Sequence, residues 1–154
     1  MKVVDGDLLD ITDGLIAHQV NCRGVMGAGV ARVIAKRYPD VEAMYRQVCA
    51  KHVTQELLGT CLVVTATNSG APTDNLWVAN VFGQLNTGRG LQTSYTAVAN
   101  AVEQLADVAD FLPDELHVPH MMGCGLAGGD WDVYSTLLDE HWPGDVIAHR
   151  LVPR

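Results

Sequence analysis

Short apolar runs alternate with amphipathic segments along the 154 residues of this chain. Runs rich in β-branched and other apolar residues predict strands, over residues 2–5, 15–20, 61–67, 76–82, 116–119 and 146–151. Apolar positions spaced three and four residues apart predict helices, over residues 30–38, 39–51, 92–110 and 130–141. Strands that alternate with helices predict an α/β fold, with helices on both faces of a mostly parallel sheet.

Two glycine-rich loops each lie between a predicted strand and a predicted helix. NCRGVMGAG occupies residues 21–29 and GCGLAGG occupies residues 123–129, and a further flexible loop is expected over 83–90. In such sheets, ligands bind where loops leave the carboxyl ends of strands. Glycines let backbone N–H groups face a ligand, and a helix N-terminus favours an anion. Two such loops predict a diphosphate-containing ligand, although tight turns would explain either loop alone equally well.

Composition narrows the classes of protein that fit. Hydrophobic residues make up 48% of the chain, and the net charge of -8 argues against a general nucleic-acid binder. The apolar runs are far too short to span a membrane. The four cysteines form no CxxC pair and no zinc-site spacing with histidines, so we expect no metal. No signal peptide is evident, which predicts reduced thiols in a cytoplasmic protein. We also expect a monomer without a cofactor. The final LVPR, residues 151–154, matches a remnant of an expression tag.

The order and spacing of several motifs resemble a macrodomain, the ADP-ribose-binding module. The matching pieces are VVDGDLLD, LIAHQVNCRGVMGAGVARVIAKRYP, WVANVFGQ, TSYTAV and HVPHMMGCGLAGGDW. They cover nearly the whole chain, so we expect one macrodomain over residues 1–152. The resemblance is to the small branch that contains ADP-ribose-1''-phosphate phosphatases and terminal ADP-ribose ester hydrolases. It implies a three-layer α/β/α fold with a central mixed, mostly parallel sheet.

The resemblance also implies which residues bind the ligand. Asp7 would accept from the adenine amino group beside the Leu8 backbone, and Leu151 would pack on adenine. Asn21 would bond the hydroxyls of the distal ribose, and Gln84 would lie near that ribose. Turn and loop-bracing roles remain open for Asp7 and Asn21. The diphosphate and distal ribose would be wrapped by residues of the two glycine loops, namely Gly24, Met26, Gly27, Ala28, Gly29, Val30, Gly123, Cys124, Gly125, Leu126 and Ala127.

The candidate catalytic residues depart from those of the ester-hydrolysing relatives. Those relatives use a lysine after the WVAN-like strand, and this chain has no lysine beyond Lys51. They also use an aspartate directly after GCGL, where this chain has Ala127. The catalytic candidates are therefore His18, whose side chain titrates near neutrality, and Asp130. Each has a plainer alternative: His18 as a hydrogen-bonded histidine within a strand, and Asp130 as the N-cap of the following helix.

Other polar groups near the predicted site are weaker candidates. Asn86 could orient water or phosphate, Arg89 could neutralise a terminal phosphate, and a Cys124 thiolate is a remote alternative without an evident neighbour to activate it.

We expect the chain to bind ADP-ribose and to hydrolyse ADP-ribose-1''-phosphate to ADP-ribose and phosphate. Two alternatives stay open. One is a module that binds ADP-ribose without chemistry, and the other is an ADP-ribosyl hydrolase acting on ADP-ribosylated protein or nucleic acid.

Overall fold

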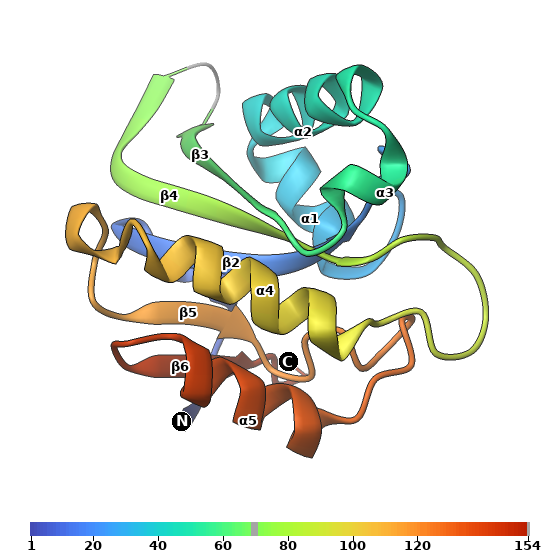
Figure 1. Cartoon of the computed structure of the whole chain (residues 1–154). Helices are drawn as coiled ribbons and strands as arrows, with labels where there is room; N and C mark the ends of the chain where they lie inside the picture. Colours follow the sequence, from blue (N-terminus) through green and yellow to red (C-terminus); the bar gives the residue numbers. More distant parts are fainter. Residues whose placement is uncertain (69–70, 154) are drawn as a thin grey trace.

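The computed structural model, which describes residues 1–68 and 71–153, contains a six-stranded sheet in the order β1-β6-β5-β2-β4-β3 (Figure 1). The strands are β1 (Lys2–Asp5), β2 (Gly14–Asn21), β3 (Cys61–Asn68), β4 (Ala71–Gln84), β5 (Leu116–Pro119) and β6 (Val146–Arg150). Only β3 and β4 pair antiparallel among the described pairs, and the others are parallel. The predicted mixed, mostly parallel sheet is confirmed.

Helices cover both faces of this sheet (Figure 1). They are α1 (Gly29–Arg37), α2 (Pro39–Lys51), α3 (Thr54–Leu57), α4 (Tyr95–Ala106) and α5 (Trp131–His141), with 3-10 turns η1 (Leu8–Asp10) and η2 (Ala109–Phe111). The helices α4 and α5 pack on one face, and α1 and α2 pack on the other. The expected three-layer α/β/α architecture is therefore confirmed.

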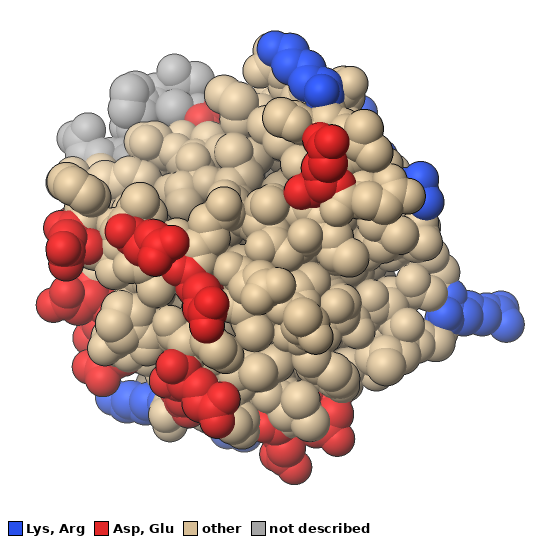
Figure 2. All heavy atoms as spheres, viewed as in Figure 1, with Lys and Arg blue, Asp and Glu red and all other residues tan. Residues whose placement is uncertain are grey.

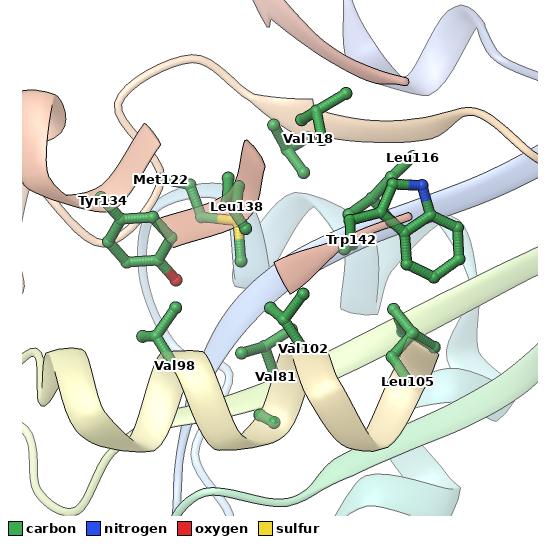
Figure 3. Packing of buried hydrophobic residues seen from close by; sticks show 14 of the residues in the cluster. Val81, Val98, Val102, Leu105, Leu116, Val118, Met122, Tyr134, Leu138 and Trp142 are labelled. Carbon is green, nitrogen blue, oxygen red and sulfur yellow. The ribbon is translucent and has the colours of Figure 1, made fainter. Parts of the chain in front are cut away.

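Strand β2 shows why both faces are covered. Its side chains alternate, so that Leu15 and Ala17 join the core under α4 and α5, whereas Ile16 and Val20 join the cores under α1 and α2. A strand buried on both sides reads as a nearly continuous apolar run, as LIA does here. Figure 3 shows the first of these cores, where side chains of α4 point toward those of α5. Each large side chain buried there stabilises the fold by about 1.5–3 kcal/mol.

The element boundaries differ from the predictions in three places. The helix expected over 92–110 begins at Tyr95, because Ser94 Oγ accepts a hydrogen bond from the Ala97 N–H at 3.2 Å and caps it. That helix ends at Ala106, and η2 follows. Strand β4 begins at Ala71, five residues before the expected start, and continues through Gln84 into the expected loop. The four-residue helix α3 was not predicted, since so short a segment shows no helical periodicity.

Charge and hydropathy complete the picture of the fold. Figure 2 shows acidic side chains scattered over the side that carries α4 and α5, with Lys and Arg at the periphery, so this face presents no continuous basic surface. Within residues 1–68 and 71–153, no helix combines the length and apolar character needed to span a bilayer. Arg154, the last residue of the suspected tag remnant, lies outside the described residues.

Candidate functional site

A cleft of about 650 Å³ opens at the carboxyl ends of β2, β4 and β5. Three segments line it: the end of β2 with the first glycine loop (residues 21–29), the start of the middle loop (residues 85–93), and the segment after β5 that includes the second glycine loop (residues 123–129). Both glycine loops thus face one cleft, as predicted. Among the described residues, no Lys, Arg, Asp or Glu lines it. An anion here must be held by backbone groups and neutral side chains.

The N-terminus of α1 lies at this cleft. Its N-cap residue, Ala28, has no side chain that could accept a hydrogen bond, so the first N–H groups of the helix lack a side-chain cap. Ala28, Gly29 and Val30 all line the cleft. By contrast, Ser94 and Asp130 cap α4 and α5 with their side chains. Uncapped N–H groups and the partial positive charge of a helix N-terminus favour a bound anion.

Two glycines on the cleft wall are not explained by packing. A Cβ added to Gly125 would meet no atom within 4 Å, and one added to Gly27 would meet only Val25 Cγ1, at 3.4 Å. Neither has a positive φ. Gly123 differs, because its φ is 70° and an added Cβ would lie 2.8 Å from Gln19 Oε1. The fold requires glycine at 123, whereas the open space at 27 and 125 suits the close approach of a ligand.

Asn21 braces the first glycine loop from within. Its Oδ1 accepts from the Arg23 N–H at 2.9 Å, and its Nδ2 donates to the Val25 carbonyl at 2.8 Å. The Tyr45 hydroxyl lies 2.9 Å from the same Oδ1 and 2.7 Å from the Asn21 carbonyl oxygen. The loop-bracing role of Asn21, the alternative to a ligand contact, is thus present in the structure. An amide nitrogen carries two hydrogens, so one Nδ2–H is left to donate to a ligand hydroxyl. The ribose-binding role of Asn21 stays a prediction.

His18 lines the cleft but is almost fully buried, with 1% of its surface exposed. Its Nε2 lies 2.7 Å from Asn80 Oδ1, and Asn80 Nδ2 in turn donates to the Leu62 carbonyl at 3.0 Å. Because that amide orientation makes Oδ1 the acceptor, His18 carries its proton on Nε2. Nδ1 has no partner among the described residues. Burial lowers the pKa of His18 to about 4, so the ring is neutral at pH 7. Any catalytic role would begin from this neutral imidazole.

The two other reactive side chains near the second glycine loop have structural partners. Asp130 Oδ1 accepts from the N–H groups of Asp132 at 2.8 Å and Val133 at 3.3 Å, which confirms the predicted N-cap of α5. Burial raises the pKa of the Cys124 thiol to about 11, and its Sγ donates to the Met122 carbonyl at 3.2 Å. Cys124 is therefore a thiol, not a nucleophilic thiolate, at neutral pH.

Other predicted residues lie at varying distances from the cleft surface. Asp7 Oδ1 accepts from the Leu9 N–H at 2.9 Å and caps η1, and Leu8 is buried. Met26 is buried in the core beside α2, whereas Leu151 lies beyond β6 and is 73% exposed. The predicted residues that line the cleft are His18, Asn21, Gly27, Ala28, Gly29, Val30, Gln84, Gly123, Gly125, Leu126 and Ala127. Those outside its lining are Asp7, Leu8, Gly24, Met26, Cys124, Asp130 and Leu151. The roles assigned to both sets stay predictions.

The cleft also includes residues that sequence reasoning missed. His120 lines it directly after β5, and its ring lies 5.2 Å from the Trp131 ring in an edge-on contact. Met121 lines it too, with a φ of 65° that non-glycine residues rarely adopt. Thr87 and Gly88 line it from the middle loop. The position of His120 at the carboxyl end of a predicted strand could have identified it, whereas no sequence signal marks the backbone of Met121.

Comparison with known proteins places the chain in a family. Residues 17–137 match the family model described as Macro domain. The chain is similar to an ADP-ribose 1''-phosphate phosphatase of Saccharomyces cerevisiae, with 40% identity over 86% of this chain and 85% of the relative. A protein of the same name from Meyerozyma guilliermondii is 28% identical over 92% of this chain and 93% of that protein. A macrodomain protein structure from Streptomyces coelicolor superposes with a TM-score of 0.76 at 28% identity, covering 96% and 97% of the two chains. The chain therefore belongs to the Macro domain family.

Proposed function

We propose that this protein binds ADP-ribose and hydrolyses ADP-ribose-1''-phosphate to ADP-ribose and inorganic phosphate. The observation that carries the proposal is the cleft, in which an uncapped helix N-terminus and two glycines that packing does not require face the same space. The names of the similar phosphatases support the same substrate. A backbone-lined site also explains how a chain of net charge -8 holds a diphosphate.

In this proposal the diphosphate lies at the N-terminus of α1, between Gly27 and Gly125. Each glycine leaves space for a phosphate oxygen to approach the backbone, and the α1 N–H groups donate to it. The distal ribose lies toward Asn21 and Gln84, which end the neighbouring strands β2 and β4. The adenine amino group lies toward Asp7, which follows β1 at the far side of the sheet.

The chemical step forms a bond between a water oxygen and the terminal phosphorus and breaks the bond from that phosphorus to the C1'' oxygen of the ribose, which takes up the proton that the water releases. His18 Nδ1 is buried and has no partner among the described residues. In this proposal, ligand binding gives the attacking water access to Nδ1, which orients the water by accepting its hydrogen bond. With its pKa lowered to about 4 by burial, the ring is a weak base, so this role is one of orientation. The proposal gives Asp130 no proton-transfer step, since its carboxylate caps α5 outside the cleft lining.

The experiment has two readouts. Phosphate release from ADP-ribose-1''-phosphate tests the chemistry, and calorimetry with ADP-ribose tests binding. We expect both in the wild-type protein, and loss of release with retained binding in His18→Phe, which fills the ring space but has no Nδ1. Binding of ADP-ribose without phosphate release above background would show a module that only binds ADP-ribose. This is the main alternative to the proposed activity, because the neutral His18 ring is a weak base. Absence of binding would refute the proposed function altogether.

A further inference from the structure

A network of hydrogen bonds centred on Gln19 lies at the wall of the cleft and joins its three lining segments. Gln19 Nε2 donates to Gln84 Oε1 and to Thr93 Oγ1, each at 2.9 Å. The Tyr134 hydroxyl donates to Gln19 Oε1 at 2.8 Å, and Thr93 Oγ1 donates to the Gly123 carbonyl at 2.7 Å. We call these five residues the loop-linking network. It connects β2, the end of β4, the middle loop, the second glycine loop and α5.

The direction of each bond in the loop-linking network is fixed. Gln19 Nε2 has two hydrogens, and both are used. Because Thr93 Oγ1 accepts one of them, its own hydrogen is free to go to the Gly123 carbonyl. Gln84 Nε2 donates to the Asn86 carbonyl at 2.8 Å, which fixes Gln84 Oε1 as the acceptor. A partly buried network of this kind admits one arrangement, since reversing a member leaves two donors or two acceptors facing each other.

The network extends to the first glycine loop through the middle loop. Arg23 Nε donates to Asn86 Oδ1 at 2.6 Å, and the backbone carbonyl of the same Asn86 accepts from Gln84 Nε2. A continuous path therefore runs from Arg23 in the first glycine loop to Gly123 in the second. The path crosses the sheet through Gln19, whose neighbours come from segments up to 115 residues away in sequence.

The packing around Gln19 shows that its side chain has a fixed place. A Cβ added to Gly83 would lie 2.5 Å from Gln19 Oε1, and one added to Gly123 would lie 2.8 Å from the same atom. The ring of Tyr134 also occupies the space beside Gly123. Two glycines from different elements thus make room for a single amide. Neither needs a ligand to explain it.

We propose that Gln19 is a positioning residue that sets the spacing of the two glycine loops through the loop-linking network, and that this spacing controls affinity for the diphosphate. The ligand part of this inference rests on the proposed function, whereas the loop spacing does not. Thr93 is the member to perturb, because it lies outside the cleft lining while it connects Gln19 to Gly123. Its backbone N–H also donates to the Ala127 carbonyl at 3.2 Å, and side-chain variants leave that bond in place.

The first test needs no ligand. Thr93→Val keeps the shape of the side chain but removes both hydroxyl bonds, so amide hydrogen exchange should rise at least about tenfold over residues 84–92 and 123–129. Thr93→Ser should restore wild-type exchange. Thr96→Val is the matched control, because Thr96 is exposed on α4 three residues later. If Thr93→Val fails to fold, Tyr134→Phe removes only the hydroxyl that holds Gln19 Oε1, and the same rise is expected.

The second test asks whether the two ends of the path communicate. Arg23→Ala and Thr93→Val should each weaken ADP-ribose binding, by about threefold and about tenfold, and the double variant should lose clearly less than the roughly thirtyfold product. Multiplying effects would show independent loops and overturn the coupling. Unchanged exchange in both Thr93→Val and Tyr134→Phe would overturn the positioning role itself. If the variants show the exchange effects but the wild-type protein does not bind ADP-ribose, the proposed function is refuted and the network's role in loop spacing stays intact.

Discussion

The buried His18 makes folding stability depend on pH in a direction that can be worked out. Its Nε2–H donates a hydrogen bond to Asn80 Oδ1, and burial lowers the pKa of the ring from 6.5 to about 4. The unfolded chain therefore binds a proton on this residue at a higher pH than the folded chain does. Between pH 6.5 and pH 4, protonation favours the unfolded state, so the free energy of unfolding falls as the pH is lowered through that window. Above pH 6.5 the effect is absent.

The size of the effect follows from the difference between the pKa values of His18 in the folded and unfolded chain. Each tenfold difference in proton affinity corresponds to about 1.4 kcal/mol, so the complete effect of His18 is about 3 kcal/mol, most of which is present at pH 4.5. The pKa values of His117 and His149 are also lowered by burial and act in the same direction. The share of His18 must therefore be isolated as a difference between variants.

Urea unfolding at pH 7.5 and pH 4.5 measures this share. His18→Gln retains a donor for Asn80 Oδ1 but does not titrate, so it should lose roughly 2–3 kcal/mol less stability than the wild type between the two pH values. His52→Gln, at an exposed histidine, is the matched control and should show the wild-type loss. If His18→Gln loses as much stability as the wild type, His18 is not a buried neutral histidine, and its orienting role in the proposed mechanism fails with it.

Three further predictions separate ligand contacts from structural ones. Gly125→Ala should change the free energy of unfolding by less than about 0.5 kcal/mol but weaken ADP-ribose binding at least about tenfold. Gly123→Ala should instead destabilise the fold by about 2–5 kcal/mol in thermal unfolding, because its φ is positive and an added Cβ has no space. Equal effects of the two variants on stability would refute the distinction. Asp130→Ala should lower the free energy of unfolding by about 0.5–2 kcal/mol, because the N-cap of α5 is lost. Asp130→Asn keeps the cap and should retain both stability and phosphate release. Loss of phosphate release in Asp130→Asn would show that the carboxylate charge takes part in catalysis. Asn21→Ala removes both the loop brace and the proposed ribose contact, so it should weaken calorimetric ADP-ribose binding by about 1–3 kcal/mol. Wild-type affinity would exclude a ribose contact.

The parts of the fold that the sequence predicts are those set by local physics. Strand β2 is recognisable because both faces are buried, which makes its run apolar without a partner having to be known. The N-cap at Asp130 is recognisable because a short carboxylate before an amphipathic run has few other local uses. The start of α4 at Tyr95 was missed, although Ser94 is an equally good cap, because apolar periodicity extends past it.

The parts of the site that were missed are set by contacts between distant segments. The tautomer of His18 depends on Asn80, 62 residues away, and on the Leu62 carbonyl that accepts from the Asn80 amide. Its low pKa depends on burial by the segments packed around it. A histidine in an apolar strand could therefore be identified as a candidate, but its protonation state could not. The same holds for Gln19, which reads as a polar residue in a strand until Thr93 and Tyr134 are seen beside it.

The motif GCGLAGG shows where reasoning from a glycine-rich sequence reaches its limit. Gly123 and Gly125 are two residues apart and identical, yet the first is required by a ring from α5 and by Gln19, and the second by nothing in the described chain. The sequence motif alone predicts that both glycines contact the ligand. The structure divides them, and only Gly125, with Gly27 across the cleft, leaves backbone open for an anion. Because α1 also begins there without a side-chain cap, the attraction for a diphosphate lies in the backbone of an acidic protein and needs no basic side chain in the lining.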